Sequence, residues 1–131
     1  MLERLLAWIK PNRPPDNTIG FLERWFLVPR TPLLEVFLNH FIGSDKVEAL
    51  HDHPSFTLSL VLKGGYIEHL KGGVTRERGA GDVLLRSPWM LHRIEMKPGG
   101  ESWSIFITGP RLREWGFMTA KGWVSHKEFF G

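Results

Sequence analysis

Cysteine is absent from the 131 residues, and no long apolar run is present. The lack of cysteine excludes a disulfide framework, a thiolate metal site and a cysteine nucleophile. Any metal site must therefore use histidine, carboxylate or backbone oxygen ligands. No segment approaches the roughly 20 consecutive apolar residues that span a bilayer. Charges interrupt the apolar stretch of residues 1–10, which therefore lacks the long apolar region of a signal peptide, so we expect a cytoplasmic protein with no membrane partner.

The chain also lacks a large excess of positive or negative charge. The 17 basic and 14 acidic residues give a net charge of +3, and the basic residues are scattered along the chain. A nucleic-acid-binding surface normally gathers its basic residues into a patch or stripe. We therefore expect no nucleic-acid partner. The 42% hydrophobic fraction, with six Trp and nine Phe, instead predicts a globular domain with a substantial core.

Short apolar runs separated by turn residues dominate the chain after residue 20. They are rich in Val, Ile, Phe and Thr, which favour strands. We predict strands over residues 25–28, 34–42, 51–53, 56–62, 66–70, 82–85, 91–96 and 102–108. Glycine-rich turn signals lie between several of them, including one at residues 64–65. No long helical pattern separates the strands, so the sequence predicts an all-β fold, an antiparallel sandwich or barrel.

The first residues predict one short helix. Leucine and isoleucine recur at helical spacing in residues 1–10, and Pro11 stops the pattern. The length fits a single domain. Within it, residues 1–33 are expected to form the N-terminal helix and a lead-in segment. Residues 34–131 are expected to form the barrel and a C-terminal return segment.

Two histidines separated by one residue, His51 and His53, give the strongest chemical signal. On an extended chain alternate side chains share a face, so both imidazoles would point the same way. That spacing suits two adjacent positions around a divalent metal with bonds of about 2.1 Å. The pair alone is weak, since histidines two residues apart arise by chance in many proteins.

The wider spacing resembles the two sequence motifs of the cupin superfamily. In the first motif, His-x-His precedes a glutamate and then a glycine seven residues later; here Thr57 and Gly64 hold those positions. In the second, a glycine precedes a histidine by eleven residues with a proline between them. Gly81, Pro88 and His92 fit that pattern.

The resemblance covers residues 34–108 and implies a cupin β-barrel, also called a double-stranded β-helix or jelly roll. It implies that His51, His53 and His92 bind a divalent metal ion. Because Thr57 stands where the family has a glutamate ligand, the site resembles that of the cysteine-dioxygenase-like cupins, which hold Fe(II) with three histidines. Another departure is Met96, at a position where the family has asparagine.

Three neutral imidazoles would leave the metal's charge uncompensated and several coordination positions open. Such a site favours an anionic, chelating substrate together with water or O₂. The resemblance favours Fe(II), but imidazole also suits other metals, and Zn, Ni or Mn are the alternatives.

Tyr66 and Glu68 share one face of the predicted 66–70 strand. If that face points inward, Glu68 is a candidate general base, hydrogen-bond partner of a ligand or replacement fourth ligand. A solvated, outward Glu68 is the alternative. On the same assumption, the Tyr66 hydroxyl would orient substrate, or its ring would only fill the barrel.

Three more residues are candidates for substrate binding. The Thr57 hydroxyl could hydrogen-bond a water on the metal, and Trp103 could contribute to the apolar lining of a pocket. Arg111 could attract a carboxylate. Core packing would equally explain Trp103, and a solvated surface charge would equally explain Arg111.

These features favour a metal-dependent enzyme on a small molecule, most directly an Fe(II) dioxygenase acting on a small anionic substrate. One alternative is a non-enzymatic module that holds a metal or small ligand. Another is a structural or interaction protein in which the histidines are incidental, with a homodimer as the expected assembly. The cupin fold hosts many reactions, so the fold does not choose between these functions.

Overall fold

The computed structural model describes residues 2–45 and 47–131. Its helical segments are α1 (Leu2–Ile9), the 3₁₀ turn η1 (Lys71–Gly73) and α2 (His126–Phe130). Its strands are β1 (Asn17–Ile19), β2 (Leu22–Phe26), β3 (Glu35–Phe41), β4 (Thr57–Leu70), β5 (Thr75–Gly79), β6 (Val83–Arg86), β7 (His92–Glu95), β8 (Ser102–Thr108), β9 (Gly116–Thr119) and β10 (Gly122–Ser125). Within the described residues, no helix has the length and apolar composition needed to cross a membrane.

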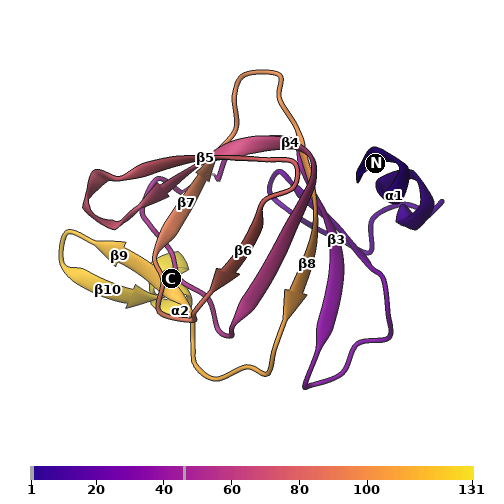
Figure 1. Ribbon diagram of the computed structural model, residues 1–131. Coiled ribbons are helices and arrows are strands. Elements are labelled where there is room, and N and C mark those ends of the chain that lie inside the picture. The colour runs from indigo at the N-terminus through magenta and orange to yellow at the C-terminus, as the bar shows by residue number, and fades with distance from the viewer. Residues whose placement is uncertain (1, 46) are drawn as a thin grey trace.

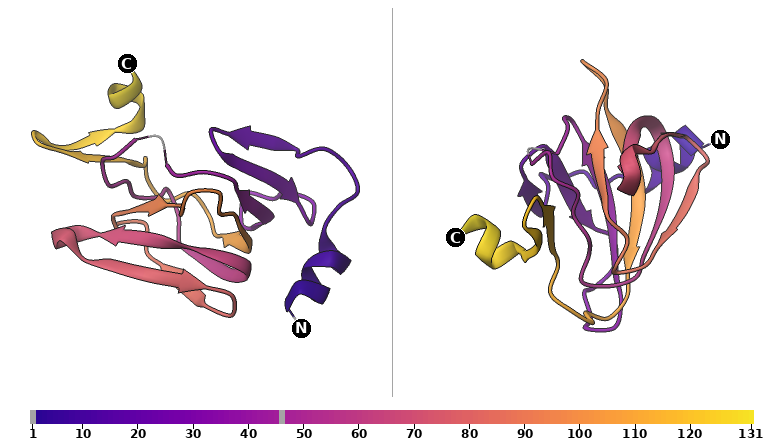
Figure 2. Two further views of the ribbon diagram at one scale, coloured as in Figure 1. Left: turned by 90° about the horizontal axis from the view of Figure 1, so that it is seen from above. Right: turned by 90° about the vertical axis from the view of Figure 1, so that its left-hand side faces the viewer.

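Eight strands of the described chain form one antiparallel sheet that curls into a barrel (Figure 1). The order along the sheet is β1-β2-β3-β8-β4-β5, and β6 and β7 also pair with β4. β9 and β10 form a separate hairpin, which lies with α2 on the side of the barrel away from α1 (Figure 2). The predicted all-β architecture with one short N-terminal helix is confirmed.

The longest strand, β4, replaces two strands that the sequence predicted with a turn at Gly64 and Gly65. Its first half pairs with β6 and β8, and its second half pairs with β5 and β7. The two glycines allow neighbouring backbones to approach closely, because a Cβ at Gly64 would lie 1.9 Å from the Glu101 carbonyl oxygen. A Cβ at Gly65 would lie 2.1 Å from the Arg78 carbonyl oxygen. The prediction of a turn was therefore wrong.

Alternating side chains on β3 and β8 divide the inside of the barrel from an outer core. Asn39 and Ser104 point inward, where they line a cavity. Their chain neighbours Leu38 and Trp103 point outward and pack with Leu6 of α1. Burying one such leucine contributes about 1.5–3 kcal/mol. The apolar stripe of α1 thus covers the outer face of the sheet and leaves the barrel interior free for a site.

A buried carboxylate, Asp52, attaches the C-terminal hairpin to the barrel. It accepts hydrogen bonds from the Gly116 backbone N–H at 2.7 Å and the Arg113 guanidinium at 2.6 Å. The Trp123 indole N–H donates a third, at 2.9 Å. Because Asp52 is the central residue of His-x-His, these bonds hold the tail directly against the two histidines.

Gly64→Ala tests the close approach at the centre of β4. Gly64 has a φ of +73°, which costs an alanine about 1–2 kcal/mol. The overlap with the Glu101 carbonyl adds strain of about 1–3 kcal/mol. Urea denaturation should therefore show a loss of about 2–5 kcal/mol in the free energy of unfolding.

Gly72→Ala is the matched control, since Gly72 also has a positive φ, +82°, but would place its Cβ in open space. Its loss should stay near 1–2 kcal/mol. Equal losses in the two variants would contradict the assigned packing of β4 against β8.

Candidate metal centre

Three histidines from two distant parts of the chain meet inside the barrel. His51 and His53 lie in the connection between β3 and β4, and His92 begins β7. Their candidate ligand nitrogens all lie within 4.8 Å of one another. Two nitrogens bound to one ion with bonds of about 2.1 Å are at most about 4.2 Å apart. Small side-chain rotations therefore suffice to bring all three imidazoles onto a single metal ion.

Backbone hydrogen bonds fix this meeting point. The N–H of His51 donates to the His92 carbonyl, and the N–H of His92 donates to the His51 carbonyl, both at 2.9 Å. The His53 N–H donates to the Pro88 carbonyl at 3.2 Å. The segment carrying the histidines is thus an isolated bridge rather than the strand that the sequence predicted for residues 51–53.

Burial keeps two of the imidazoles neutral. Burial, with a smaller contribution from the nearby His92, lowers the pKa of His51 to about 3. The pKa of His53 also falls well below its usual range, first through burial and then through the charges of His92 and His51. A neutral imidazole has the free lone pair that a metal ligand needs.

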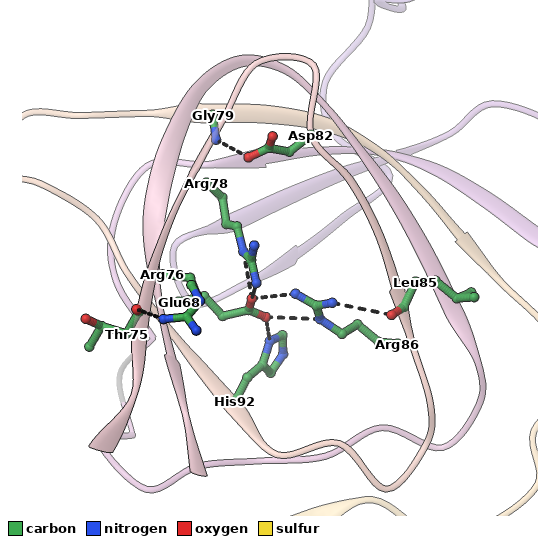
Figure 3. Close-up of polar contacts among 9 residues, drawn as sticks. All are labelled: Glu68, Thr75, Arg76, Arg78, Gly79, Asp82, Leu85, Arg86 and His92. Atoms are coloured by element: carbon green, nitrogen blue, oxygen red, sulfur yellow. Dashed lines mark hydrogen bonds and ion pairs between the residues drawn. The ribbon is translucent and has the colours of Figure 1, made fainter. Parts of the chain in front are cut away.

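Glu68 determines which nitrogen of His92 faces the centre (Figure 3). The Nδ1 of His92 lies 2.6 Å from the Glu68 carboxylate, so the Nδ1–H donates to it and Nε2 is left for a metal. Arg78 and Arg86 donate to the same carboxylate, at 2.8 and 2.5 Å. Of the roles left open by the sequence, this geometry fits a hydrogen-bond partner that orients a ligand.

The Glu68 side chain is only 1% exposed, yet it stays ionised. Burial alone would raise its pKa, but the hydrogen bonds from His92, Arg86 and Arg78 outweigh burial and hold the pKa at about 2. Because all of these groups bind the same two oxygens, Glu68 has little capacity left to coordinate an ion directly.

The residues present fit a divalent metal. Among the described residues, the His53 Nδ1 is a buried side-chain nitrogen without a hydrogen-bond partner. Leaving such an atom unsatisfied costs about 1–3 kcal/mol, and a bound cation can satisfy a buried imidazole nitrogen. Three imidazole donors suit Zn, Fe, Ni or Cu, so the donor set fits a metal without naming it.

The three histidines line a cavity of about 790 Å³. This volume lies in the range typical of small-molecule sites. Part of the wall is aromatic, with Phe37, Phe106 and Phe117 among the lining residues. Such a space accommodates a ligand that has an apolar part next to the metal centre.

The structure brings Thr57, Tyr66 and Arg111 into this cavity with Glu68. Burial, with a contribution from the Glu68 charge, raises the pKa of Tyr66 to about 12, so its hydroxyl keeps its proton at neutral pH. Arg111 lines the cavity from an exposed position. Thr57 is buried on the inward face of β4.

The remaining candidate, Trp103, does not line the cavity. Its ring stacks on His40, with ring centroids 3.7 Å apart, and on Trp25 at 5.7 Å. On β8, Ser102 and Ser104 face inward, so side-chain alternation directs Trp103 outward into the core beneath α1. The assignment of Trp103 to substrate binding was wrong for this reason.

Sequence reasoning missed three arginines that the structure brings to the site. Arg78 and Arg86 bind Glu68, and Arg24 lines the cavity. Arg78 lies on β5, a strand that the sequence did not predict. Arg24 and Arg86 reach the site because their side chains point into the barrel. The amino-acid composition of a strand does not determine which of its faces points inward.

No family model matches the sequence, and no curated protein matches it. Solved structures do match. A cupin-like protein from Thermotoga maritima is 18% identical, with a TM-score of 0.63 over 89% of this chain and 92% of that chain. The polyketide cyclase RemF from Streptomyces resistomycificus is 16% identical, with a TM-score of 0.67 over 89% of this chain and 80% of that chain.

The DMSP lyase DddQ from Ruegeria pomeroyi is also similar, at 13% identity and a TM-score of 0.61 over 87% of this chain and 60% of that chain. Identities this low show a shared fold and leave the activity open. The predicted cupin fold is therefore confirmed.

Glu68→Gln tests the buried carboxylate. Removing the charge leaves Arg78 and Arg86 without a counter-ion, which should lower the free energy of unfolding by about 3–5 kcal/mol in chemical denaturation. It also weakens the bond that orients His92. Zinc affinity, measured by competition with a chelating dye, should fall about 10–100-fold.

Glu77→Gln is the control, because Glu77 is 78% exposed and its only ion-pair partner among the described residues is Lys97, at 3.4 Å. It should change stability by less than about 1 kcal/mol and leave zinc affinity unchanged. Wild-type zinc affinity in a folded Glu68→Gln protein would contradict the assigned role of Glu68.

Proposed function

We propose that this chain, which has the cupin fold, binds a divalent metal ion through His51, His53 and His92 and acts on a small anionic substrate. The observation that carries the proposal is the convergence of three imidazoles at the wall of one cavity. Two of them are held neutral by burial, and the third is oriented by a buried carboxylate. A structural role for the histidines alone would not require the His53 Nδ1 to lack a partner.

A bound metal would supply Lewis acidity and open coordination positions next to the substrate. The chain's own residues would do the rest. Glu68 keeps the proton of His92 on Nδ1, and Tyr66, which lines the cavity, keeps a hydroxyl proton that it can donate to a ligand. The aromatic part of the wall excludes water from the apolar part of the substrate.

Among the possible reactions, we favour Fe(II)-dependent dioxygenase chemistry. Glu68 is held by three side chains and would have to break those bonds to act as a general base. This favours a reaction driven by the metal and O₂ over one that depends on a protein carboxylate as base. The same observation supports a non-enzymatic binding module as the second candidate.

Metal loading tests the ligand set. Alanine at His51, His53 or His92 should each abolish stoichiometric loading, measured by elemental analysis after incubation with Fe(II) under argon or with Zn(II). The matched control is His69→Ala, since His69 lies on β4 but contacts Glu95 at 2.7 Å instead of the centre. Retained loading in His92→Ala would sink the proposed three-histidine site.

Oxygen consumption separates the two candidate functions. The Fe(II)-loaded protein should consume O₂ with at least one member of a panel of small carboxylates and thiols, recorded on an oxygen electrode. The His51→Ala protein should consume none above background. Metal loading without consumption on any compound would favour the binding module.

A further inference from the structure

Most of the charged side chains that line the cavity have an ion-pair partner. Arg86 binds Glu68, and Arg30 binds Glu35. Asp52 binds Arg113, a residue that does not line the cavity. Each pair satisfies its own charge, so these groups have little to offer a ligand.

Arg24, on the inward face of β2, differs from this pattern. Its Nε donates to the Asn39 side-chain oxygen at 3.1 Å. In the described part of the chain, it has no hydrogen bond to a carboxylate, and its two terminal nitrogens have no bonded partner. A guanidinium carries five N–H donors, so most of its donor capacity is unused.

Aromatic rings hold this guanidinium in place. Its Cζ lies 4.7 Å from the centre of the Phe37 ring and 5.5 Å from that of Phe106. Burial lowers the pKa of Arg24 to about 10, against the opposing effect of the Glu35 charge, so Arg24 stays cationic at neutral pH while partly buried. A cation in such surroundings binds an anion more strongly than an exposed one does.

The surroundings of Arg24 also carry further polar groups. Strand register places Arg24 beside Asn39, and Asn39 beside Ser104, in one inward-facing row across three strands. Asn39 and Ser104 are 2% and 3% exposed. The adjacent inward-facing row contains Phe37 and Phe106. A polar row beside an aromatic row suits a ligand with a charged end and an apolar body.

We propose that Arg24 binds the carboxylate of an organic acid, whose apolar part contacts Phe37 and Phe106 and whose other end reaches the histidine centre. This inference rests on the proposed function, which makes the histidine centre a metal site that binds a small anionic substrate. A planar guanidinium with two free terminal nitrogens matches a carboxylate in a two-point contact. One partly buried cation, which has no ion-pair partner among the described residues, balances one negative charge, and this favours a monocarboxylate over a phosphate. Arg111 is more exposed and serves this role less well.

The same cavity joins Arg24 to the metal centre. Arg24, His53 and His92 all line it, and the charge of Arg24 is one of the causes that lower the pKa of His53. A small acid can therefore contact both ends of the site at once.

Hexanoate and its neutral counterpart hexanamide are the probes, used in calorimetric titrations of metal-free and Zn-loaded protein. The metal-free protein matters because there the carboxylate cannot bind a metal. Wild-type metal-free protein should bind hexanoate about 10–100-fold more tightly than hexanamide, as a charge-assisted contact predicts. Arg24→Gln should abolish that preference, and Arg24→Lys, which keeps the charge, should retain part of it.

The control is Arg76→Gln, because Arg76 is exposed and, within the described residues, its side chain donates only to the Thr75 carbonyl. It should keep the full preference for hexanoate. A folded Arg24→Gln protein that still prefers hexanoate would overturn the proposal, as would a wild-type protein that binds neither probe. Inorganic phosphate binding more tightly than hexanoate at Arg24 would overturn the choice of a carboxylate.

The two proposals fail separately in this design. Loss of the hexanoate preference with unchanged zinc loading in Arg24→Gln supports the anion site and leaves the metal site intact. Absence of zinc loading in the wild type would overturn the proposed function, while the metal-free titration would still report on Arg24.

Discussion

The buried Glu68 carboxylate is the interaction on which the candidate site depends. It lies on β4, and its partners Arg78, Arg86 and His92 come from β5, β6 and β7, the strands that pair with β4. An uncompensated carboxylate at this depth would be strongly unfavourable. All three partners must therefore be in place when the barrel closes. The same carboxylate also sets the proton position on His92, so closing the sheet and arranging the candidate metal centre depend on the same contacts.

The charge of the cavity follows from the same arrangement. Glu68 is more than balanced by two arginines, and the histidines of the centre include two that burial keeps neutral. Arg24 adds a positive charge without a carboxylate partner among the described residues. A divalent ion would make the cavity more positive still. Its electrostatics therefore favour an anion, whichever reaction takes place there.

The C-terminal hairpin contributes a different constraint. Asp52 is held by the backbone and side chains of that hairpin and lies between two of the proposed ligands. Trp115 and Phe117 of the same region line the cavity. The tail is thus part of the site, although the sequence indicated only an irregular return segment there.

The sequence predicted the cluster of three histidines better than it predicted the surroundings of that cluster. The resemblance to the two cupin motifs singled out His51, His53 and His92, and the structure brings these three side chains together. The sequence could not decide whether Glu68 faced inward, since alternation gives the relative facing of neighbours and no absolute direction. The same limit produced the wrong assignment of Trp103. The role of Arg24 depends on Phe106, 82 positions further along the chain, so only the folded register reveals it.

The most direct test of the central claim is X-ray absorption spectroscopy of the zinc-loaded protein. The account predicts three imidazole nitrogens at about 2.0–2.1 Å, completed by a light atom from solvent. The spectrum should keep its zinc–nitrogen distances in Glu68→Gln at saturating metal, because Glu68 orients a ligand without being one. Fewer than three imidazoles in the wild type, or loss of one oxygen neighbour in Glu68→Gln, would contradict it.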